Sequence, residues 1–186
     1  LTKFPVPIWT VGEDPGPYLT APQVVSIDPD TKEGNVGTYR VQVKGKKRTG
    51  VWVGETQNMQ LHMQKHRASG EPMPVAIVLG AEPCIGLCSV AKIPVRQDEY
   101  AVAGGLRGKP LDLVACETIP LHVPAHAEIV IEGWIDPSYM EEEGPFGEYT
   151  GYMGPAGQAH VVEVSCLTHR NDPIYHAFIS QMPPSE

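Results

Sequence analysis

Glycine and proline interrupt this sequence from end to end, and no other feature limits its possible folds as strongly. Each occurs 19 times in 186 residues, and neither is gathered into one linker. Turn residues at this density favour many short strands over long helices. The length is that of one domain with a sizeable core. The sequence therefore predicts a mainly β domain with helical insertions, of the α+β type, built as a barrel or a sandwich.

Apolar and β-branched runs indicate where the strands lie. The residues from Arg40 to Val43 alternate polar and apolar side chains, which is typical of a half-buried strand. Residues 75–79 form a continuous apolar run, so we expect that strand to be buried on both faces. A turn over residues 29–34 should separate the first two strands. The predicted strands are 24–27, 38–43, 50–53, 75–79, 111–116, 128–134, 160–166 and 174–179.

Two helices are predicted from their end signals. Thr56 can cap a helix over residues 57–67, and Asp98 can cap a second helix over residues 99–106. A glycine follows each segment within a few residues, as is common after the last turn of a helix. His62 and His66 are spaced like the metal ligands of an HExxH motif, but Met63 stands where that motif has glutamate. We therefore interpret the two histidines as part of a solvated helix face.

Charge and cysteine content exclude several classes of function. The net charge of −8 argues against a nucleic-acid surface, and the basic residues 44–48 are interpreted as a solvated hairpin tip. No apolar run approaches the roughly 20 residues of a membrane span. Four cysteines without a CxxC pair are typical of buried, inert thiols in a reducing cytoplasm. Both ends of the sequence are expected to be internal points of a longer protein.

An acidic loop at residues 141–148 is the first candidate for chemistry. Glu143 and Glu148 flank a Gly-Pro-Phe-Gly turn that should hold the backbone tightly. Two carboxylates near each other or near an arginine can have different proton affinities, which suits one of them for proton transfer. Composition alone favours the alternative, a solvated acidic turn, and Glu141 and Glu142 are interpreted as such surface groups.

A second candidate segment is Asn35 to Arg40. We expect Asn35 to end a turn, and Gly37 would let the backbone approach a ligand closely. Backbone amides and Thr38 could hold a phosphate, while Arg40 could bind a carboxylate through two hydrogen bonds. The alternative is the start of a hairpin with a surface arginine.

Considered in chain order, the motifs resemble the UbiD decarboxylase family over nearly the whole sequence. The matching pieces are 3–7, 18–21, 28–31, 35–40, 80–83, 93–94, Glu99, 143–148 and 149–152, and residues 181–186 resemble a point before the C-terminal domain of that family. The most specific single piece is 143–148. The resemblance implies a split β-barrel like that of FMN-binding flavin reductases. It also implies that residues 1–186 are the central cofactor-binding domain of a longer chain with further N- and C-terminal domains.

The resemblance also implies an activity and its cofactors. UbiD enzymes are reversible, non-oxidative carboxy-lyases that interconvert aromatic or α,β-unsaturated carboxylic acids with CO2 and the decarboxylated product. They act through a covalent adduct with prenylated FMN, which is bound with Mn²⁺ (or Mg²⁺) and K⁺. For this protein we therefore expect small acids and CO2 as partners, a cytoplasmic location, and a homo-oligomer of the full-length chain, with or without other subunits. The piece 1–186 is expected to be inactive by itself.

Site residues carry over from the family position by position. Arg40 and Glu143 match a paired arginine and glutamate, and Glu148 matches the glutamate that exchanges a proton with the reacting carbon. Asn35 and Glu99 match metal ligands, and oxygen donors of this kind suit magnesium or manganese. The expected cofactor-contacting residues are Thr20, Asn35, Thr38, Tyr39, Arg40, Gln57 and Glu99.

The sequence departs from the family at Asn58, Ala91 and Lys92. Ferulic acid decarboxylases have a metal-binding histidine after the glutamine that matches Gln57, whereas this chain has Asn58, whose amide oxygen can still bind a hard cation. Two other functions stay open from the sequence. One is a flavin-binding module, or a subunit of a multi-subunit carboxylase, without catalysis of its own. The other is a flavin reductase on a related barrel, which has no need of Arg40, Glu143 and Glu148.

Overall fold

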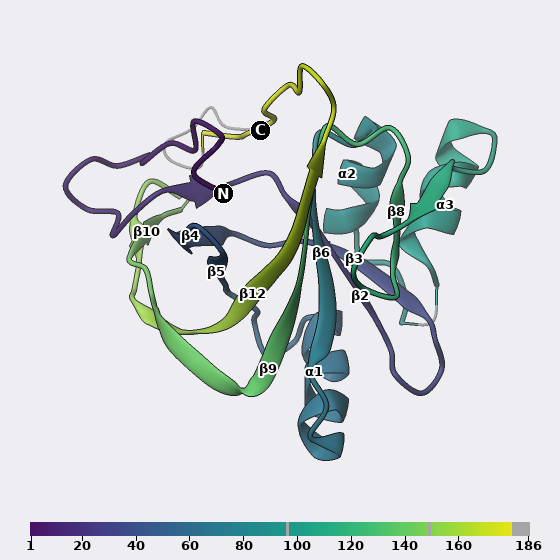
Figure 1. The fold of residues 1–186 in the computed structure, drawn as a ribbon, viewed down its shortest axis with the longest axis horizontal. Coiled ribbons are helices and arrows are strands. Elements are labelled where there is room, and N and C mark those ends of the chain that lie inside the picture. Colours follow the sequence, from purple (N-terminus) through teal and green to yellow (C-terminus); the bar gives the residue numbers. More distant parts are fainter. Residues whose placement is uncertain (96, 149, 180–186) are drawn as a thin grey trace.

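The computed structural model describes residues 1–95, 97–148 and 150–179. Within these ranges the chain is mainly β with three helices, which confirms the α+β class (Figure 1). The helices are α1 (Asn58–Ser69), α2 (Pro83–Val90) and α3 (Glu99–Arg107). The strands are β1 (Tyr18–Leu19), β2 (Gln23–Ile27), β3 (Gly34–Thr38), β4 (Val41–Gly45), β5 (Arg48–Val51), β6 (Met73–Leu79), β7 (Leu113–Ala115), β8 (His122–Pro124), β9 (Ile129–Glu143), β10 (Phe146–Gly147), β11 (Met153–Gly154) and β12 (Gly157–His169).

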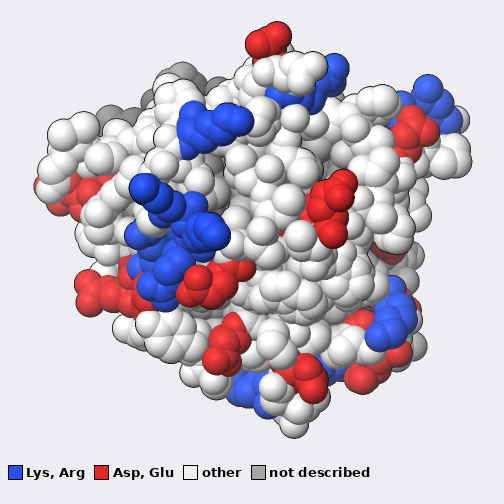
Figure 2. Space-filling model, in the orientation of Figure 1, with Lys and Arg blue, Asp and Glu red and all other residues white. Residues whose placement is uncertain are grey.

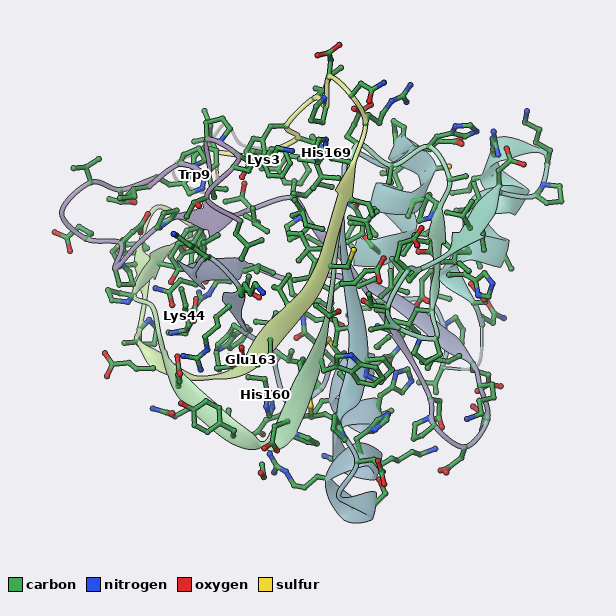
Figure 3. All side chains as sticks on the ribbon, in the orientation of Figure 1. Lys3, Trp9, Lys44, His160, Glu163 and His169 are labelled. Atoms are coloured by element: carbon green, nitrogen blue, oxygen red, sulfur yellow. The ribbon has the colours of Figure 1, made fainter. Side chains whose placement is uncertain are left out.

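One antiparallel sheet of eight strands organises the molecule. Its order is β1-β4-β5-β12-β9-β6-β2-β3, and β7–β8 and β10–β11 form separate two-stranded ribbons. In the described residues β1 and β3 are the two edges, so the sheet stays open. The long strands β9 and β12 bend across its middle (Figure 1), where their pairing shifts register twice. The N-terminal segment lies against the end of β12, where Lys3 Nζ is 2.6 Å from His169 Nε2 (Figure 3).

The central strand β6 is buried on both faces, as its apolar run predicts. Val75, Ile77 and Leu79 belong to a core that includes Met59 and Met63 of α1. The alternate residues, Ala76 and Val78, face a second core formed with α2 and α3. The sheet therefore lies between α1 on one face and the α2–α3 pair on the other, because strand side chains alternate between the faces. Within the described residues no helix is long and apolar enough to cross a membrane.

The two predicted helices form, with small differences at their ends. Gln57, not Thr56, precedes the first residue of α1, and no side chain caps that end. At α3 the Asp98 side chain accepts a hydrogen bond from Tyr100 N at 2.7 Å, as predicted for a cap. Helix α2 was not predicted, although Cys84 and Cys88 have helical spacing. It is only eight residues long, and its mostly apolar sequence has no polar face to reveal a period.

Several strand predictions need correction. The expected strand over 38–43 is interrupted between Thr38 and Val41, and Asn35 lies inside β3 instead of ending a turn. The strand predicted over 128–134 continues to Glu143, because the pairing with β12 jumps from Ile135 to Met140 and so accommodates Pro137. No strand forms over 174–179. Tyr149 and the motif at 181–186 lie outside the described residues.

The basic residues 44–48 do form a hairpin tip, between β4 and β5. Lys46 and Lys47 are exposed there. Arg48 binds Glu141 at 2.6 Å and Glu163 at 2.7 Å. Figure 2 shows basic side chains of this face next to acidic ones, so the cluster is neutralised locally instead of forming an uninterrupted basic surface.

Asp28 connects the turn after β2 to helix α1. Its Oδ1 accepts hydrogen bonds from Asp30 N at 2.9 Å and Thr31 N at 3.2 Å, and Lys65 Nζ donates to both carboxylate oxygens. Burial raises the pKa of the Asp28 carboxyl, but these donors outweigh that effect and bring the pKa from 3.8 to about 2. The turn and the helix are thus held together by the ion pair between Asp28 and Lys65.

We predict that Asp28→Asn lowers the stability of the fold in a pH-dependent way. The folded pKa lies below the unfolded one, so the charge stabilises the fold above about pH 4 and this contribution is lost as the pH falls through about 2. Urea unfolding midpoints of the variant and the unmodified protein should differ near neutral pH and converge in acid. Asp172→Asn, at an exposed residue, is the control. A gap that stays constant with pH would contradict the prediction.

Candidate functional site

Arg40 joins the two segments that the sequence singled out. It lies in the break between β3 and β4, 103 residues before Glu143 and 108 residues before Glu148. Its Nε and Nη2 donate to Glu143 Oε1 and Oε2 at 2.9 and 2.8 Å, and its Nη1 donates to Glu148 Oε1 at 3.0 Å. One guanidinium therefore holds two carboxylates, the first through a bidentate pair.

The two carboxylates have different surroundings. The Glu143 side chain is fully buried, and the Arg40 side chain is 13% exposed. The Glu148 side chain is 45% exposed. Within the described residues its Oε2 makes no hydrogen bond, so this oxygen can exchange a proton with solvent or with a ligand. Glu143 thus fixes the arginine, while Glu148 remains available for acid–base chemistry.

Aromatic rings surround the arginine. The β4–β5 register pairs Val41 with Val51, so Arg40 and Trp52 lie opposite each other at the end of that hairpin. The Arg40 Cζ atom is 5.2 Å from the centre of the Trp52 ring and 5.6 Å from that of Phe146. These distances allow cation–π attraction to both rings. Trp52 was not recognised from the sequence; only the register of the hairpin would have placed it at the site.

A short hairpin positions Glu148. Strands β10 and β11 pair Phe146 with Gly154, and Glu148 N donates to Tyr152 O at 2.8 Å. A Cβ atom at Gly154 would lie 3.0 Å from Glu148 Oε1 and 3.3 Å from Arg40 Nη1. A side chain at this glycine would therefore crowd the contact between the arginine and the glutamate. The expected acidic turn is a β10–β11 hairpin preceded by the end of β9.

The three predicted metal ligands line one small cavity. Asn35, Asn58 and Glu99 surround a space of about 30 Å³ between β3 and the N-terminal ends of α1 and α3. A water molecule needs roughly 10–15 Å³, so a small ion fits this space. Asn35 is 5% exposed, and within the described residues its Nδ2 makes no hydrogen bond of good geometry, although it interacts with the Tyr39 hydroxyl. Because an amide nitrogen and oxygen can exchange places, this is an amide whose bonding is incomplete without a ligand.

Glu99 supplies the acidic group of this cavity. Its Oε2 accepts a hydrogen bond from Val36 N at 3.0 Å. Burial raises the pKa of its carboxyl, so a cation in the cavity would relieve the cost of its buried charge. No group of three or more His, Cys, Asp or Glu in the described part of the chain is arranged to hold a metal. An ion here would depend on amide oxygens and on groups of a bound ligand, and the oxygen donors suit Mg²⁺ or Mn²⁺.

The other expected cofactor-contacting residues all make contacts within the protein. The Thr20 hydroxyl donates to Phe178 O at 2.7 Å and accepts from Phe178 N at 2.9 Å. Thr38 Oγ1 is 2.7 Å from Ser89 Oγ, and Gln57 Oε1 accepts from Gly54 N at 2.5 Å. Tyr39 is buried, with its ring over Gly37, where a Cβ atom would be 2.5 Å from the ring.

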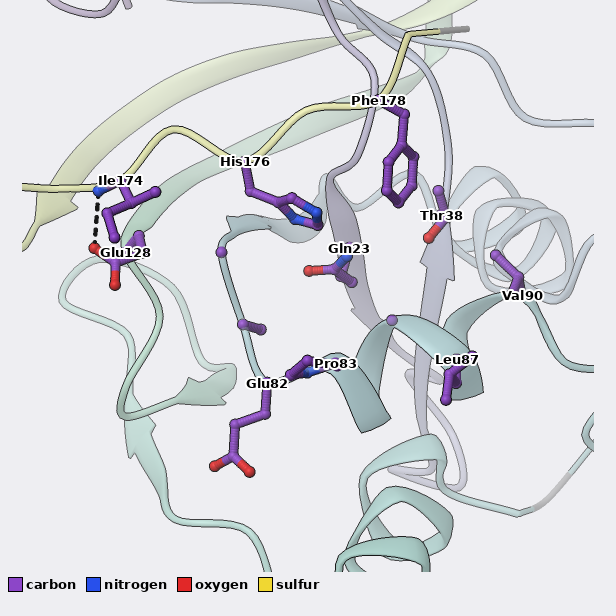
Figure 4. A pocket seen from close by; sticks show the side chains of 13 residues that line it. Gln23, Thr38, Glu82, Pro83, Leu87, Val90, Glu128, Ile174, His176 and Phe178 are labelled. Carbon is purple, nitrogen blue, oxygen red and sulfur yellow. Dashed lines mark hydrogen bonds between the residues drawn. The ribbon is translucent and has the colours of Figure 1, made fainter. Parts of the chain in front are cut away.

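A large apolar hollow adjoins Thr38. It has a volume of about 680 Å³ and lies between α2 and the segment after β12 (Figure 4). His176 and Phe178 line it from the segment after β12, and Leu87 and Val90 line it from α2 (Figure 4). Leu87 is 64% exposed and Val90 is 67% exposed. A hollow of this size and lining can accept a planar organic molecule or an apolar side of another domain.

The interpretation of His62 and His66 as a solvated face is wrong. Both are 7% exposed, because this side of α1 packs on the sheet. His62 Nδ1 is 3.0 Å from Ser26 Oγ, and His66 Nδ1 is 3.3 Å from Glu71 O. The four cysteines are free, but only Cys88 is buried and the other three are partly exposed, so the prediction of buried thiols holds in part. Burial raises the pKa of the thiols of Cys88, Cys116 and Cys166.

Comparison with known proteins gives a consistent result. The sequence profile of the family described as UbiD, 3-octaprenyl-4-hydroxybenzoate carboxy-lyase Rift-related domain, matches residues 1–183. A protein of Archaeoglobus fulgidus without an assigned function is 37% identical over 188 aligned residues, covering all of this chain and 39% of that protein. The chain therefore spans about two fifths of the length of this curated relative.

Two solved enzymes share the fold and much of the sequence. The UbiD-class enzyme HmfF from Pelotomaculum thermopropionicum, in complex with FMN, matches with a TM-score of 0.92 and 42% identity over 97% of this chain and 40% of its own. An evolved dimeric form of that enzyme contains prFMN. The vanillic acid decarboxylase of Sedimentibacter hydroxybenzoicus, in closed form, matches with a TM-score of 0.84 and 36% identity over 88% of this chain and 36% of its own.

The unequal burial of the two carboxylates predicts unequal costs of the same substitution. Glu143→Gln places an amide donor against the donors of a largely buried Arg40, and leaving a buried charge unpaired costs about 3–5 kcal/mol. Glu148→Gln removes a half-exposed partner and should cost less than about 1 kcal/mol. Urea unfolding of both variants measures the difference. Equal destabilisation by the two substitutions would show that Arg40 does not depend mainly on Glu143.

Proposed function

The chain belongs to the UbiD family, and we propose that it is the central, cofactor-binding domain of a longer carboxy-lyase. In this proposal residues 1–186 are one domain, and N- and C-terminal domains of the full-length protein complete the site. Its coverage of about two fifths of the HmfF chain supports this organisation. The open, strongly bent sheet is interpreted as a split β-barrel related to the FMN-binding barrel of flavin reductases.

The proposed reaction is the reversible, non-oxidative decarboxylation or carboxylation of an aromatic or α,β-unsaturated acid. The observation that carries the proposal is the contact of one arginine, Arg40, with both Glu143 and Glu148. A module that only bound flavin would not need a buried acid to orient an arginine next to a half-exposed acid. We therefore favour catalysis over a purely binding or accessory role.

The proposed cofactor is prenylated FMN, held with Mn²⁺ or Mg²⁺ and with K⁺. Asn35, Glu99 and Asn58 would hold the divalent ion next to the flavin phosphate, and the incomplete bonding of Asn35 supports this fit. Residues 35 to 40 span at most about 17 Å, which suits a cofactor with its phosphate at one end and its rings at the other. Thr20, Thr38, Tyr39 and Gln57 would line its path. When bound, prenylated FMN supplies the electron sink for the reacting carbon.

The residues of this chain would supply orientation and a proton. Arg40 attracts the carboxylate of the acid and holds Glu148 toward it. As the bond between carbon and carboxylate breaks and CO2 leaves, protonated Glu148 delivers its proton to that carbon. The half-exposed Glu148 side chain then regains a proton from solvent. In carboxylation Glu148 removes the proton instead, so one group serves both directions.

The assembly and location of the full-length protein stay predictions. We propose a homo-oligomer, with or without additional subunits, that acts in the cytoplasm on small acids and CO2. The identity of the substrate acid depends on pocket walls that the other domains would contribute, and so does the physiological direction of the reaction. Measuring CO2 release from a panel of aromatic and unsaturated acids, with H/D exchange into the products, would identify the substrate.

We predict that Glu148→Gln abolishes turnover in the full-length protein while flavin binding survives. The amide keeps the shape of the side chain and a contact with Arg40, but it cannot transfer the proton. CO2 release and the absorption spectrum of the bound flavin measure the two effects. Glu142→Gln, at the neighbouring position assigned to the surface, is the control and should leave turnover unchanged. Retained activity of Glu148→Gln would refute the assignment.

We predict that Glu99→Gln weakens binding of Mn²⁺ by roughly tenfold or more in the full-length protein, because it removes the charged ligand from the cavity. Reconstitution with prenylated FMN and Mn²⁺, followed by the flavin absorption spectrum and by metal titration, measures the loss. Glu13→Gln, at an exposed residue, should bind as the unmodified protein does. A full-length protein that binds no flavin under these conditions would overturn the proposed cofactor.

A further inference from the structure

Tyr18 is a buried residue that touches the arginine network from outside it. It is 0% exposed and belongs to the edge strand β1. Its hydroxyl oxygen accepts a hydrogen bond from Gly144 N at 3.1 Å, immediately after Glu143 in the chain. Its ring lies 4.3 Å from that of Phe146, which in turn lies against Arg40. Tyr18 therefore contacts two residues, Gly144 and Phe146, of the segment that connects Glu143 to Glu148.

The backbone of Tyr18 is held firmly in place. Its carbonyl accepts a hydrogen bond from Trp9 Nε1 at 2.9 Å, and its N–H donates to Pro7 O at 3.0 Å. Pairing of Tyr18 with Gln42 attaches it to β4, the strand that begins directly after Arg40. The N-terminal segment that supplies Trp9 lies along this edge of the molecule (Figure 3). The Tyr18 hydroxyl is therefore held in a defined position, from which it can fix the turn after β9 through Gly144.

The turn after Glu143 depends on a glycine at position 144. Gly144 has a φ of +82°, a conformation that favours glycine, and a Cβ atom there would lie 3.1 Å from Pro155 O. Burial raises the pKa of the Tyr18 hydroxyl, and the negative charge of Glu143 raises it further. The hydroxyl consequently keeps its proton and can share it with the Glu143 carboxylate while it accepts from Gly144. A carboxylate has enough lone pairs to accept this bond and both bonds from Arg40.

We propose that Tyr18 is a positioning residue for proton transfer, acting through Gly144 and Glu143 to orient Arg40 and hence Glu148. The inference rests on the proposed function, because it assigns Tyr18 a role in the reaction that Glu148 would perform. Glu148 itself is held to Arg40 by one hydrogen bond, so its direction depends on how firmly the arginine is held. Tyr18 is a neutral group at the buried end of this chain of contacts, where it accepts a hydrogen bond from Gly144 N.

Tyr18→Phe in the full-length, flavin-loaded enzyme tests the proposal. Phenylalanine keeps the ring stacked on Phe146 but leaves Gly144 N without its acceptor and removes the donor near Glu143. We expect kcat per bound flavin to fall roughly tenfold or more while KM for the acid changes little, because an uncharged donor to a charged network is lost. The pH–rate profile should change as well, because the protonation of a charged network depends on the donors around it.

Tyr175→Phe is the matched control. The Tyr175 hydroxyl is also buried but has no hydrogen-bond partner among the described residues, so its removal should change neither kcat nor the pH profile. A purely structural role of Tyr18 would lower the yield or stability of the enzyme and leave kcat per bound flavin and the pH profile unchanged, which would overturn the proposal. If Glu148→Gln is inactive but Tyr18→Phe behaves like the unmodified enzyme, this inference alone fails. If Glu148→Gln is active, the proposed function fails with it.

Discussion

The bidentate pair between Arg40 and Glu143 is the interaction on which the rest of the site depends. It joins the break after β3 to the end of β9, two points 103 residues apart in the chain. Its buried side is enclosed by sheet and aromatic rings, so the pair excludes water and has a defined geometry. Because the charges compensate each other inside the fold, the guanidinium can present its remaining nitrogen toward solvent without an unpaired charge in the core. The proposed proton transfer by Glu148 depends on the direction of Arg40 Nη1, which holds its carboxylate.

The sequence predicted the secondary structure correctly where the signal lay within one element, as an apolar run or as a capping residue at a helix end. The apolar run of β6 and the Asp98 cap of α3 are clear examples, since each depends on residues within one element. The failures share a different cause. The length of β9 and the burial of His62 depend on partners far away in sequence, namely β12 for the strand and the sheet beneath α1 for the histidine. Contacts with such distant partners do not change the pattern of apolar and polar residues within the segment, so that pattern cannot predict them.

The candidate site shows the same division. Composition alone favoured a solvated turn for Glu143, and only the resemblance to a family connected it with Arg40. The structure brings the two together because the sheet order places β4 and β5 beside β12, which pairs in turn with β9. It likewise brings Asn35, Asn58 and Glu99 to one cavity from a strand and two helix ends. Trp52 and Tyr18 could not be assigned from the sequence, because their importance lies in the register of strands and not in their own neighbours along the chain.

The exposure of Glu148, set beside the complete burial of Glu143, has a consequence for how such a site can change over evolution. The buried half contributes to the stability of the domain, so substitutions there carry a large cost in folding free energy. The exposed half belongs to the short β10–β11 hairpin, which the eight-stranded sheet does not include. Mutations at exposed positions of that hairpin, such as Tyr152, can therefore change the surroundings of Glu148 while the pair between Arg40 and Glu143 is inherited unchanged. One scaffold could in this way acquire new substrates by drift in a few hairpin residues, with little loss of fold stability along the path.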